Sequence, residues 1–419
     1  MKNSNIQWIG AIPDSWGIRK VKQCFYISKE QARKKKPIIL SLARSSVKIR
    51  DISTNEGQLA VSYDNYNPVQ PGDILLNPMD LYSGANCNMS EIEGVISPAY
   101  VNLRKKELLN PKFFDYYFKV QYWTMAMFAH GKGVSFDNRW TMNSDAILNY
   151  YLPYPSLEEQ NKIVECISKR TAKIDRLIEI ENQQIEKLKE YKQAVITEAV
   201  TKGLDKSAPM KDSGVEWIGK IPEAWAMNRL KFIATCNDDS LGEDTEENAE
   251  ISYVDIGSVS LEDGVTKIEN FEFKDAPSRA RRITRVGDII VSTVRTYLKA
   301  IATINQENLI VSTGFCVIRP SETMNKRYVE FFCKSNKFTD EVSRNSYGIS
   351  YPAINASALI NFWITIPPIE TQEHVVEFLN EKCCKIDSLL KIKQKKIDML
   401  NEYKKSLIYE CVTDKKEVV

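Results

Sequence analysis

The sequence contains very little histidine, and its cysteines are not spaced for a metal site. Only His130 and His374 are present among 419 residues, and none of the nine cysteines belongs to a C-x-x-C pair. A tetrahedral zinc site, which needs four nitrogen or sulfur ligands, is therefore not predicted. Two imidazoles also leave little for histidine-based acid–base catalysis. No stretch approaches the roughly 18 apolar residues that a membrane helix needs, so no membrane partner is expected.

The chain also lacks an excess of charge of one sign. Its 57 lysines and arginines against 55 acidic residues leave a net charge of +2. The length predicts two to three domains. The first eight residues lack the apolar run of a signal peptide. An odd number of cysteines without such a signal fits a reducing compartment, so we expect a cytoplasmic protein.

Two short segments resemble catalytic motifs but lack the residues that the chemistry requires. Residues 214–220 spell G-x-x-x-x-G-K, yet Ile221 stands where a phosphate-binding loop has Ser or Thr, and Pro222 would block the following helix. Asn77-Pro78-Met79-Asp80 resembles the N-P-P-Y loop of adenine methyltransferases without its aromatic ring. No Ser–His–Asp order and no metal-ligand cluster is found in the sequence. The chain is therefore predicted to be non-catalytic and to bind no cofactor or metal itself.

What the sequence does contain is a duplication. Residues 6–22 return 209 positions later as residues 215–231, and both copies share the frame W-I-G-x-I-P-x-x-W. The Gly72-Asp73-Ile74 segment returns at an offset of 215, as does the glycine-centred segment that begins at Gly133. At an offset of 212, 19 of the 47 positions in residues 155–201 are identical to those in residues 367–413. The chain therefore consists of two half-molecules, each with a variable globular part and a similar final segment.

Each similar segment is predicted to be one long helix. Ser156-Leu157-Glu158-Glu159 has the pattern of a capping box, and no proline or glycine follows as far as Val200. About 45 residues at 1.5 Å each make a rod of about 68 Å, so its apolar stripe needs a partner. The other copy is the natural partner in a coiled coil; a core helix inside a bundle is the alternative. The stripes comprise Ile163, Ile167, Ile174, Leu177, Leu188, Val195 and Ala199, and Val375, Leu379, Ile386, Leu389, Leu400, Leu407 and Cys411.

The charges near the middle of the two helices bear on their orientation. Glu179 and Glu181 of the first copy correspond to Lys391 and Lys393 of the second, so pairing the two centres brings acid to base. A parallel pair in register would match these charges as well. Connectivity favours the antiparallel arrangement, because a whole globular domain follows the first helix and twofold duplications usually close face to face.

The globular parts are predicted to be mixed α and β. Gly-Asp turns precede buried strands at 73–76 and 288–291, and a further strand is expected at 311–318. Aromatic-rich segments at 111–123 and 326–338 are typical of short helices that pack on a sheet. The predicted fold class is α+β, with two mixed α/β domains in a pseudo-twofold repeat joined by two long helices in an antiparallel coiled coil. The predicted ranges are 1–154 and 204–366 for the globular domains, and 155–203 and 367–419 for the helices.

Charge by segment is more informative than the total. The first globular part holds 19 basic and 13 acidic residues, a net of +6, whereas the second holds 19 and 23, a net of −4. Clustered arginines bind phosphates and fork onto guanine edges, although a solvated surface is the alternative for any single run. Their occurrence in both copies favours DNA. The candidate DNA-binding residues are Lys34, Lys35, Arg44, Lys48, Arg50, Lys132, Arg139, Arg279, Arg281, Arg282, Arg295, Arg344 and Tyr347.

Within the second globular part, the arginines are expected to differ in role. Arg295 follows the strand at 288–291 and is predicted to read a base, with an ion pair inside the domain as the alternative. Arg281 and Arg282 lie in a basic run that is better suited to phosphates. The glycine-centred loops at 131–133 and 347–351 suit close approach to a DNA groove but could equally be tight turns.

The combination of these features resembles the specificity subunit of type I restriction–modification enzymes. The resemblance rests on W-I-G-x-I-P-x-x-W before each globular part and P-x-x-E-x-Q at the start of each helix, with Thr371 a departure at the position of Glu159. It implies two target-recognition domains, each reading half of a split DNA site, with the helices as spacer. It also implies two methyltransferase subunits as partners and, through them, motor-nuclease subunits. S-adenosylmethionine, ATP and Mg²⁺ would belong to those partners. The alternative is a coiled-coil adaptor without sequence-specific DNA binding.

Overall fold

The computed structural model describes residues 1–30, 37–52, 60, 62–79, 81, 87–133 and 140–413. The chain forms two compact units, unit 1 (Met1–Glu181 with Lys395–Val419) and unit 2 (Asn182–Gln394). Both divisions fall near the middle of a long helix, so each unit holds one globular part and about half of each helix. The four domain ranges drawn from the sequence remain predictions.

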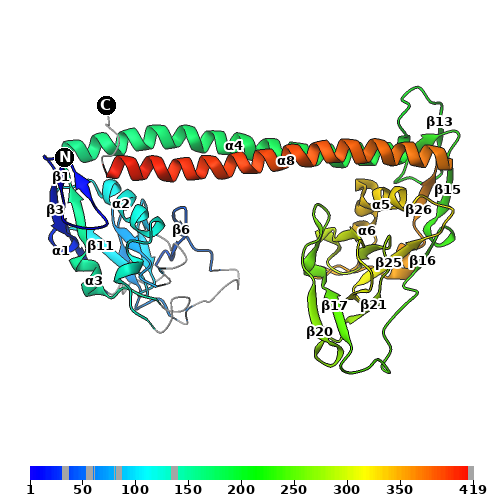
Figure 1. The fold of residues 1–419 in the computed structure, drawn as a ribbon, viewed down its shortest axis with the longest axis horizontal. Helices are drawn as coiled ribbons and strands as arrows, with labels where there is room; N and C mark the ends of the chain where they lie inside the picture. The colour runs from blue at the N-terminus through cyan, green and yellow to red at the C-terminus, as the bar shows by residue number, and fades with distance from the viewer. Residues whose placement is uncertain are drawn as a thin grey trace. The chain divides into compact units, whose positions relative to one another are not determined.

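The two predicted long helices are present as α4 (Leu157–Lys202) and α8 (Ile369–Val412), shown in Figure 1. The capping box at the start of α4 is confirmed. Glu159 Oε2 accepts hydrogen bonds from the Ser156 backbone N–H at 3.0 Å and from its hydroxyl at 2.9 Å, while the Glu159 N–H donates to Ser156 Oγ at 3.3 Å. These contacts satisfy donors that the first turn of a helix leaves unpaired.

Ion pairs between α4 and α8 show that the helices run antiparallel within each unit, as predicted (Figure 1). In unit 1, Lys404 Nζ lies 2.6 Å from Asp175 Oδ1. In unit 2, Lys192 Nζ lies 2.6 Å from Asp387 Oδ1. Lys192 and Lys404 are equivalent at the offset of 212, and so are the two aspartates. The same pair of positions is thus used in both units with the helices exchanged, as a twofold relation requires.

The centres of α4 and α8 are also paired through equivalent positions. Lys396 Nζ contacts Glu181 Oε1 at 2.5 Å in unit 1, and Lys393 donates to the side chain of Gln184 in unit 2. Residues 181 and 184 are equivalent to residues 393 and 396. The acidic centre of α4 therefore meets the basic centre of α8, which is the pairing that the sequence predicted.

The apolar seam of the helix pair is narrower than predicted. Ile163, Ile167 and Ile174 are buried in the core of unit 1, as expected. Leu177 and Leu389 are 45% and 46% exposed, so their place in the buried stripe was wrong. The physical reason is that a pair of helices covers only one seam, and residues on its flank stay in solvent. The two leucines occupy equivalent positions, so the exposure is itself duplicated.

The globular part of unit 1 is built on a four-stranded antiparallel sheet in the order β4-β11-β8-β9. Helix α2 (Pro111–Trp123) has the predicted bounds and buries Phe113, Phe114 and Phe118 in the core that also receives α4 and α8. The sheet comprises β4 (Phe25–Ile27), β11 (Val101–Lys105), β8 (Ile74–Leu76) and β9 (Cys87–Met89). The remaining elements are β1 (Lys2–Asn3), β2 (Ala11–Ile12), β3 (Gly17–Lys20), α1 (Val21–Cys24), β5 (Leu40–Leu42), β6 (Val47–Ile49), β7 (Asn67–Val69), β10 (Gly94–Ile96), η2 (Phe128–His130), α3 (Ser144–Asn149) and β12 (Tyr151–Tyr154).

The globular part of unit 2 contains two four-stranded sheets, β16-β25-β22-β23 and β20-β17-β24-β21. The second includes the parallel pair of β17 and β24. The sheets comprise β16 (Ala234–Cys236), β25 (Phe315–Pro320), β22 (Ile289–Ser292), β23 (Ile301–Thr303), β20 (Glu269–Glu272), β17 (Glu250–Val254), β24 (Leu309–Ser312) and β21 (Ala280–Ile283). The other elements are β13 (Met210–Asp212), β14 (Lys220–Pro222), β15 (Ala226–Arg229), η3 (Leu230–Phe232), η4 (Ile256–Ser258), β18 (Val259–Ser260), β19 (Gly264–Val265), η5 (Phe273–Asp275), η6 (Thr296–Leu298), α5 (Lys326–Lys334), α6 (Asn336–Arg344), α7 (Ala356–Leu359) and β26 (Trp363–Ile366).

Two predictions for unit 2, a strand at 311–318 and a helix at 326–338, were wrong because each segment forms two separate elements. The expected strand at 311–318 is divided between β24 and β25, which belong to different sheets. The turn between them contains Gly314, where an added Cβ would come within 2.5 Å of Ile256 Cδ1. The expected helix at 326–338 is divided at Ser335, which has extended backbone and accepts the Phe338 N–H on its hydroxyl at 3.3 Å. Ser335 therefore ends α5 and caps α6.

The P-x-x-E-x-Q motif ties each long helix to its globular part. In unit 1, Gln160 accepts the Asn110 N–H at 2.9 Å and donates to the carbonyl of the motif's own proline at 3.0 Å. In unit 2, Gln372 makes the same two bonds, with Asn325 at 3.0 Å and with its proline at 2.9 Å. Asn110 and Asn325 are the N-caps of α2 and α5. The motif therefore joins two helix starts through one buried amide.

Candidate nucleic-acid interface

Arg295 occupies an unusual backbone position in the turn that follows β22 (Ile289–Ser292). Its φ is +50°, in the left-handed region, and its side chain is exposed. The guanidinium carbon lies 5.0 Å from the centroid of the Tyr351 ring, a cation–π contact. Among the described residues, no carboxylate forms an ion pair with Arg295. This leaves Arg295 available for an external partner, whereas the alternative of an internal ion pair has no support in the described residues.

Arg295 belongs to a surface formed by two loops, residues 293–299 and 344–353, which we call the two-loop surface. The loops are joined by a β-bridge between Val294 and Ala353 and by a 2.8 Å hydrogen bond between the hydroxyls of Thr296 and Ser346. Neither loop contains an acidic residue, although the globular part around them has a net charge of −4. The loops carry Arg295, Arg344 and Lys299, and Lys299 is paired with Asp340 of α6 at 3.1 Å. Arg295 and Arg344 therefore supply the positive charge of this surface in a region that is acidic overall.

The two-loop surface also exposes large apolar and aromatic side chains. Tyr347 is 84% exposed, Ile349 102% and Tyr351 67%. Tyr297 and Leu298 of the other loop are exposed as well. Exposed aromatic rings beside arginines, without carboxylates, are the composition that nucleic-acid surfaces use. Of this surface, the sequence pointed to Arg295, Arg344 and Tyr347 as candidates and to the loop 347–351, which includes Tyr351, as a groove-contacting loop. It gave no signal for Tyr297, which only the folded loops bring to this surface.

The other candidate arginines of unit 2 are arranged around the same region in different ways. The Arg279 carbonyl accepts the Thr313 N–H at 2.8 Å, beside the turn that also bonds to the first residue of the two-loop surface. Arg281 lies over the Phe273 ring at 4.7 Å. Arg282, one residue further along β21, is half-buried. Only Arg279 is thus placed next to the two-loop surface, while the assignment of Arg281 and Arg282 to phosphates stays a prediction.

The candidates of unit 1 are more scattered. Arg44 and Lys48 are exposed beside and on β6, and Arg50 follows the strand. Arg44 also lines a cavity of about 870 Å³ together with Lys119 at the end of α2 and Lys405 of α8. The remaining predicted residues of the first globular part, Lys34, Lys35 and Arg139, lie outside the described residues.

Lys132 of unit 1 and Tyr347 of unit 2 are equivalent positions. Each forms an antiparallel bridge that closes a loop, Lys132 with Thr141 and Tyr347 with Ala353, and each is followed by a glycine. The loop of unit 1 is the longer of the two. The same structural position therefore presents a lysine in one unit and a tyrosine in the other, so the two loops have diverged in chemistry as well as in length.

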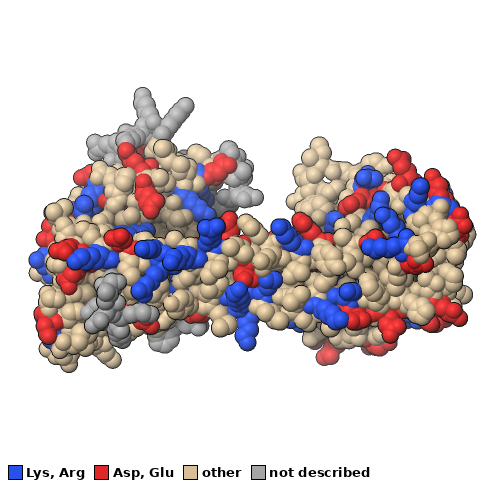
Figure 2. All heavy atoms as spheres, turned by 90° about the horizontal axis from the view of Figure 1, so that it is seen from above, with Lys and Arg blue, Asp and Glu red and all other residues tan. Residues whose placement is uncertain are grey.

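Figure 2 shows one face of the molecule with the charged side chains coloured. On this face, lysines and arginines form several separate groups with acidic residues between them, and they do not form one continuous basic surface. Recognition of a polyanion is therefore expected to depend on local groups such as the two-loop surface.

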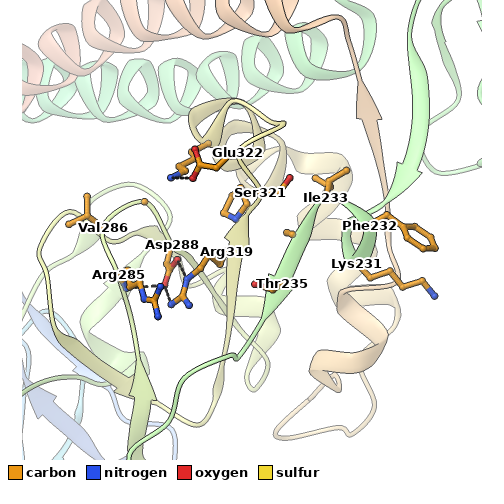
Figure 3. Close-up of a pocket in the computed structure, with 14 residues that line it drawn as sticks. Lys231, Phe232, Ile233, Thr235, Arg285, Val286, Asp288, Arg319, Ser321 and Glu322 are labelled. Atoms are coloured by element: carbon orange, nitrogen blue, oxygen red, sulfur yellow. Dashed lines mark hydrogen bonds and ion pairs between the residues drawn. The ribbon is translucent and has the colours of Figure 1, made fainter.

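A cavity of about 410 Å³ in unit 2 is lined by four basic residues, yet three of them are neutralised by acids (Figure 3). Arg319 forms two hydrogen bonds with Asp288, at 2.9 and 2.8 Å. Arg285 pairs with Asp239 at 2.8 Å, and Lys326 pairs with Glu322 at 3.1 Å. Hydrogen bonding to Asp288 raises the pKa of Arg319. These cations serve the fold, and the cavity is not an anion site.

The ion pair in this cavity is duplicated in unit 1 and explains the Gly-Asp turns. Arg104 forms the equivalent pair with Asp73, at 2.9 and 2.8 Å, and the offset of 215 relates both partners. The second carboxylate oxygen of each aspartate also accepts a backbone N–H three residues earlier, at 2.9 Å in both units. The aspartate therefore closes the turn, and the arginine on the neighbouring strand compensates its buried charge. The sequence analysis identified the turn but not the arginine.

Several expectations about other chemistry can be compared with the described residues. Among them, no group of three His, Cys, Asp or Glu side chains is placed to hold a metal ion. None of their helices has the length and apolar content that crossing a membrane requires. The G-x-x-x-x-G-K segment ends in strand β14, with Lys220 as its first residue, rather than at the start of a helix. This geometry agrees with the prediction that the segment is not a phosphate-binding loop.

Comparison with known proteins identifies the same family for different parts of the chain. Residues 222–402 match the family model of the Type I restriction modification DNA specificity domain. The type I restriction enzyme MjaVIII specificity subunit of Methanocaldococcus jannaschii is 25% identical over 359 residues, covering 83% of this chain and 80% of that protein. The putative MjaX specificity subunit of the same organism is 25% identical over 281 residues, covering 66% and 62%.

A solved structure shows the same fold. The structure, from work on complex assembly and conformational transition of the type I R-M system, matches with a TM-score of 0.67 and 14% identity. The match covers 96% of this chain and 98% of that one. The matching domain and the relatives are named for specificity rather than for a reaction, which agrees with the expectation of a non-catalytic chain. With the motifs that frame both halves, these findings show that residues 222–402 match a type I restriction modification DNA specificity domain and that the chain as a whole is similar to specificity subunits of type I restriction–modification systems.

Proposed function

We propose that this chain reads a bipartite DNA site, with the globular part of each unit recognising one half. The observation that carries the proposal is that the two units keep the same contacts between the long helices and the globular parts, while the loops at equivalent positions differ. Gln160 and Gln372 make the same contacts in the two units, whereas Lys132 and Tyr347 differ at equivalent positions. A retained frame with altered loops is what two readers of different half-sites require.

The duplication also explains how two similar domains can act on one duplex. The strands of DNA are antiparallel, so two domains related by a twofold axis meet the same backbone geometry on opposite strands. Contacts to phosphates would then be alike in the two halves, and contacts to base edges would differ. In unit 2, Arg295 is the residue proposed to fork onto a guanine, and Arg279 lies beside it.

We propose that the antiparallel pair of α4 and α8 sets the number of base pairs between the half-sites. Support comes from the paired contacts Lys404–Asp175 and Lys192–Asp387, which fix the register of the helices in both units. A fixed register prevents the helices from sliding, so the residue count between the globular parts would determine the gap.

Two equivalent apolar patches on the helices are proposed to bind two methyltransferase subunits. In unit 1 the patch comprises Leu177 and Ile180 of α4 with Met399 and Tyr403 of α8, and in unit 2 it comprises Tyr191 of α4 with Leu389 and Ile392 of α8. These residues are 39–64% exposed, and all but Met399 recur as the same residue at the offset of 212. A duplicated exposed patch suits two copies of one partner.

The remaining parts of the system follow from the methyltransferase partners. Motor-nuclease subunits would join through them, and S-adenosylmethionine, ATP and Mg²⁺ would be bound by the partner subunits. The proposed location is the cytoplasm, where the host DNA lies.

The test is to exchange the first globular part for that of a relative and to map methylated sites in host DNA by methylation-aware sequencing. One half of the recognised sequence should change and the other should stay the same. If both halves change together, the modular assignment is wrong. A coiled-coil adaptor without DNA binding would give no sequence-specific methylation dependent on this chain, and the purified chain would show no salt-dependent retention on heparin.

A further inference from the structure

We propose that the turn at residues 347–351 is an apolar wedge that inserts between neighbouring base pairs of the half-site read by unit 2. The inference rests on the proposed function, because it requires that unit 2 binds duplex DNA. It goes beyond that function by assigning a distinct mode of contact to this turn, namely unstacking of a base step instead of hydrogen bonding to base edges or phosphates.

The exposure of the turn is the first argument. Ile349 at its tip is 102% exposed, and the flanking Tyr347 and Tyr351 are 84% and 67% exposed. An isoleucine offers neither a donor nor an acceptor, so it gains nothing from phosphates and little from base edges. Between two base pairs it would be covered on both sides by apolar base faces, and the adjacent tyrosine rings can stack on the displaced bases.

The rigidity of the turn is the second argument, because a wedge must resist the force needed to separate stacked bases. The N–H and C=O groups of Tyr347 and Ala353 form two hydrogen bonds, at 2.8 and 2.9 Å, across the base of the turn. Gly348 has a φ of +112°, and a Cβ at this position would lie 3.1 Å from the Tyr351 carbonyl oxygen. Glycine therefore permits a closed turn that other residues would strain. The Ile354 N–H, bonded to the Thr293 carbonyl at 2.8 Å, anchors it to the neighbouring loop.

The charge around the turn is the third argument, and it selects DNA as the occupant. Arg295 lies against Tyr351 on one side, and Arg344 ends α6 just before the turn. Neither loop of the two-loop surface contains an acid. Positive charge next to an apolar tip attracts the DNA polyanion to the step that the tip opens. Because Lys299 is paired with Asp340, this charge comes from Arg295 and Arg344. Two arginines beside an apolar tip suit a polyanion better than a neutral protein surface.

The experiment uses the full chain and duplexes that carry 2-aminopurine, a base whose fluorescence rises on unstacking, at successive positions of the half-site of unit 2. Wild-type protein should raise the fluorescence at one step only. The Ile349→Ala variant should lose this signal and weaken binding by about tenfold, because the alanine methyl group cannot fill the space between two separated base pairs. The matched control is Ile268→Ala, which removes another exposed isoleucine of unit 2 and should change neither quantity.

Three outcomes would overturn the wedge. If wild type binds its site specifically and no position gains fluorescence, the turn does not open the stack, although DNA reading stands. If Ile349→Ala keeps the DNA signal but loses a methyltransferase subunit in pull-down, the turn is a protein-docking surface. If wild type shows no sequence-specific binding, the proposed function fails and the wedge fails with it. Thermal melting of both variants should match wild type, because neither side chain is buried.

Discussion

In both units the central sheet lies between a core shared with the long helices and a second, smaller core. In unit 1, Ile74 and Leu76 of β8 face the core formed with α2 and the long helices, while Leu75 faces a second, smaller core. In unit 2, Ile289 and Val291 of β22 face the corresponding helical core, and the residue between them faces the opposite side. Because side chains alternate along a strand, the same strand contributes to the helical core on one face and to the smaller core on the other.

On the side away from the helices, both units carry a second set of strands with the same layout. In unit 2 it is a four-stranded sheet with the parallel pair of β17 and β24, and in unit 1 the two-stranded pairs β5–β6 and β7–β10 are joined by a parallel bridge between Ile39 and Val95. Val95 is equivalent to Ile310 of β24 at the offset of 215, so the units differ in the extent of this sheet among the described residues and not in its arrangement. The helix-facing side must fit α4 and α8, which are similar in both units, so substitutions there are constrained by packing. The opposite side packs on the second set of strands, whose sequence and length differ between the units, so substitutions there are not tied to the shared helices.

The strongest test of this comparison changes the separation of the two halves and leaves both faces intact. Four residues should be inserted both at Asn182 and at Gln394, which are equivalent positions at the centres of α4 and α8. A paired insertion adds about one turn, or about 6 Å, to both helices, close to two base pairs of rise. Affinity for the original site should fall at least about a thousandfold, towards non-specific binding, and return on a site with a longer gap.

Binding to a series of duplexes with different gaps measures this effect, and insertion in α4 alone is the control. The single insertion shifts the register of Lys192 with Asp387 and should destabilise the helix pair. An unchanged preferred gap in a folded double-insertion variant would mean that the helices do not set the spacing.

The second test compares the equivalent arginine–aspartate pairs of the two units. Arg104→Ala and Arg319→Ala should each lower the free energy of unfolding of their own unit by about 3 kcal/mol, because Asp73 and Asp288 would remain buried without a counter-charge. Chemical denaturation measures the loss. Arg285→Ala, which removes an exposed arginine of the same cavity, is the control and should have little effect. If only one of the two substitutions lowers the free energy of unfolding strongly, the two arginine–aspartate pairs do not contribute equally to stability.

The third test compares two arginines of unit 2, one proposed to read a base and one expected to bind phosphates. Arg295→Ala should cost about 1–3 kcal/mol on the cognate site and relax one position of one half-site, with no change in melting temperature because its side chain is exposed. Arg282→Ala should weaken binding to all sequences alike and make the salt dependence shallower by about one. Titrations of cognate and mutated duplexes at several salt concentrations distinguish the two. If Arg295→Ala weakens binding without altering sequence preference, Arg295 does not read a base.

The smallest expected effect tests the twofold relation of the helices. The Lys404–Asp175 pair of unit 1 and the Lys192–Asp387 pair of unit 2 are equivalent and only partly covered, so each should contribute only about 0.5 kcal/mol. Double-mutant cycles with alanine at each pair measure the coupling. Equal coupling energies would support the symmetry, and coupling in only one unit would show that the helices have diverged as well.

Most of the architecture could be predicted because it is repeated or local. The duplication was visible as identical spacing, the bounds of α2 followed from a single amphipathic segment, and the capping box needed only residues 156–159. The antiparallel orientation needed one further argument, since the central charges fit both orientations and connectivity decided between them. The resemblance to type I specificity subunits rested on the two motifs that frame both halves.

What only the tertiary structure decided depends on partners that are distant in the sequence. The turn at Gly314 leaves no room for a side chain because Ile256 lies beside it, and the exposure of Leu177 follows from the narrow seam between two helices. Neither feature can be recognised from the sequence around it, because the apolar pattern that predicts the strand or the helix continues through both sites. Arg319 was likewise not distinguishable from other arginines until it was placed beside Asp288. The sequence by itself thus determined the repeated frame. The folded structure assigned each arginine to the fold or to the surface, because that choice depends on which acids lie within reach.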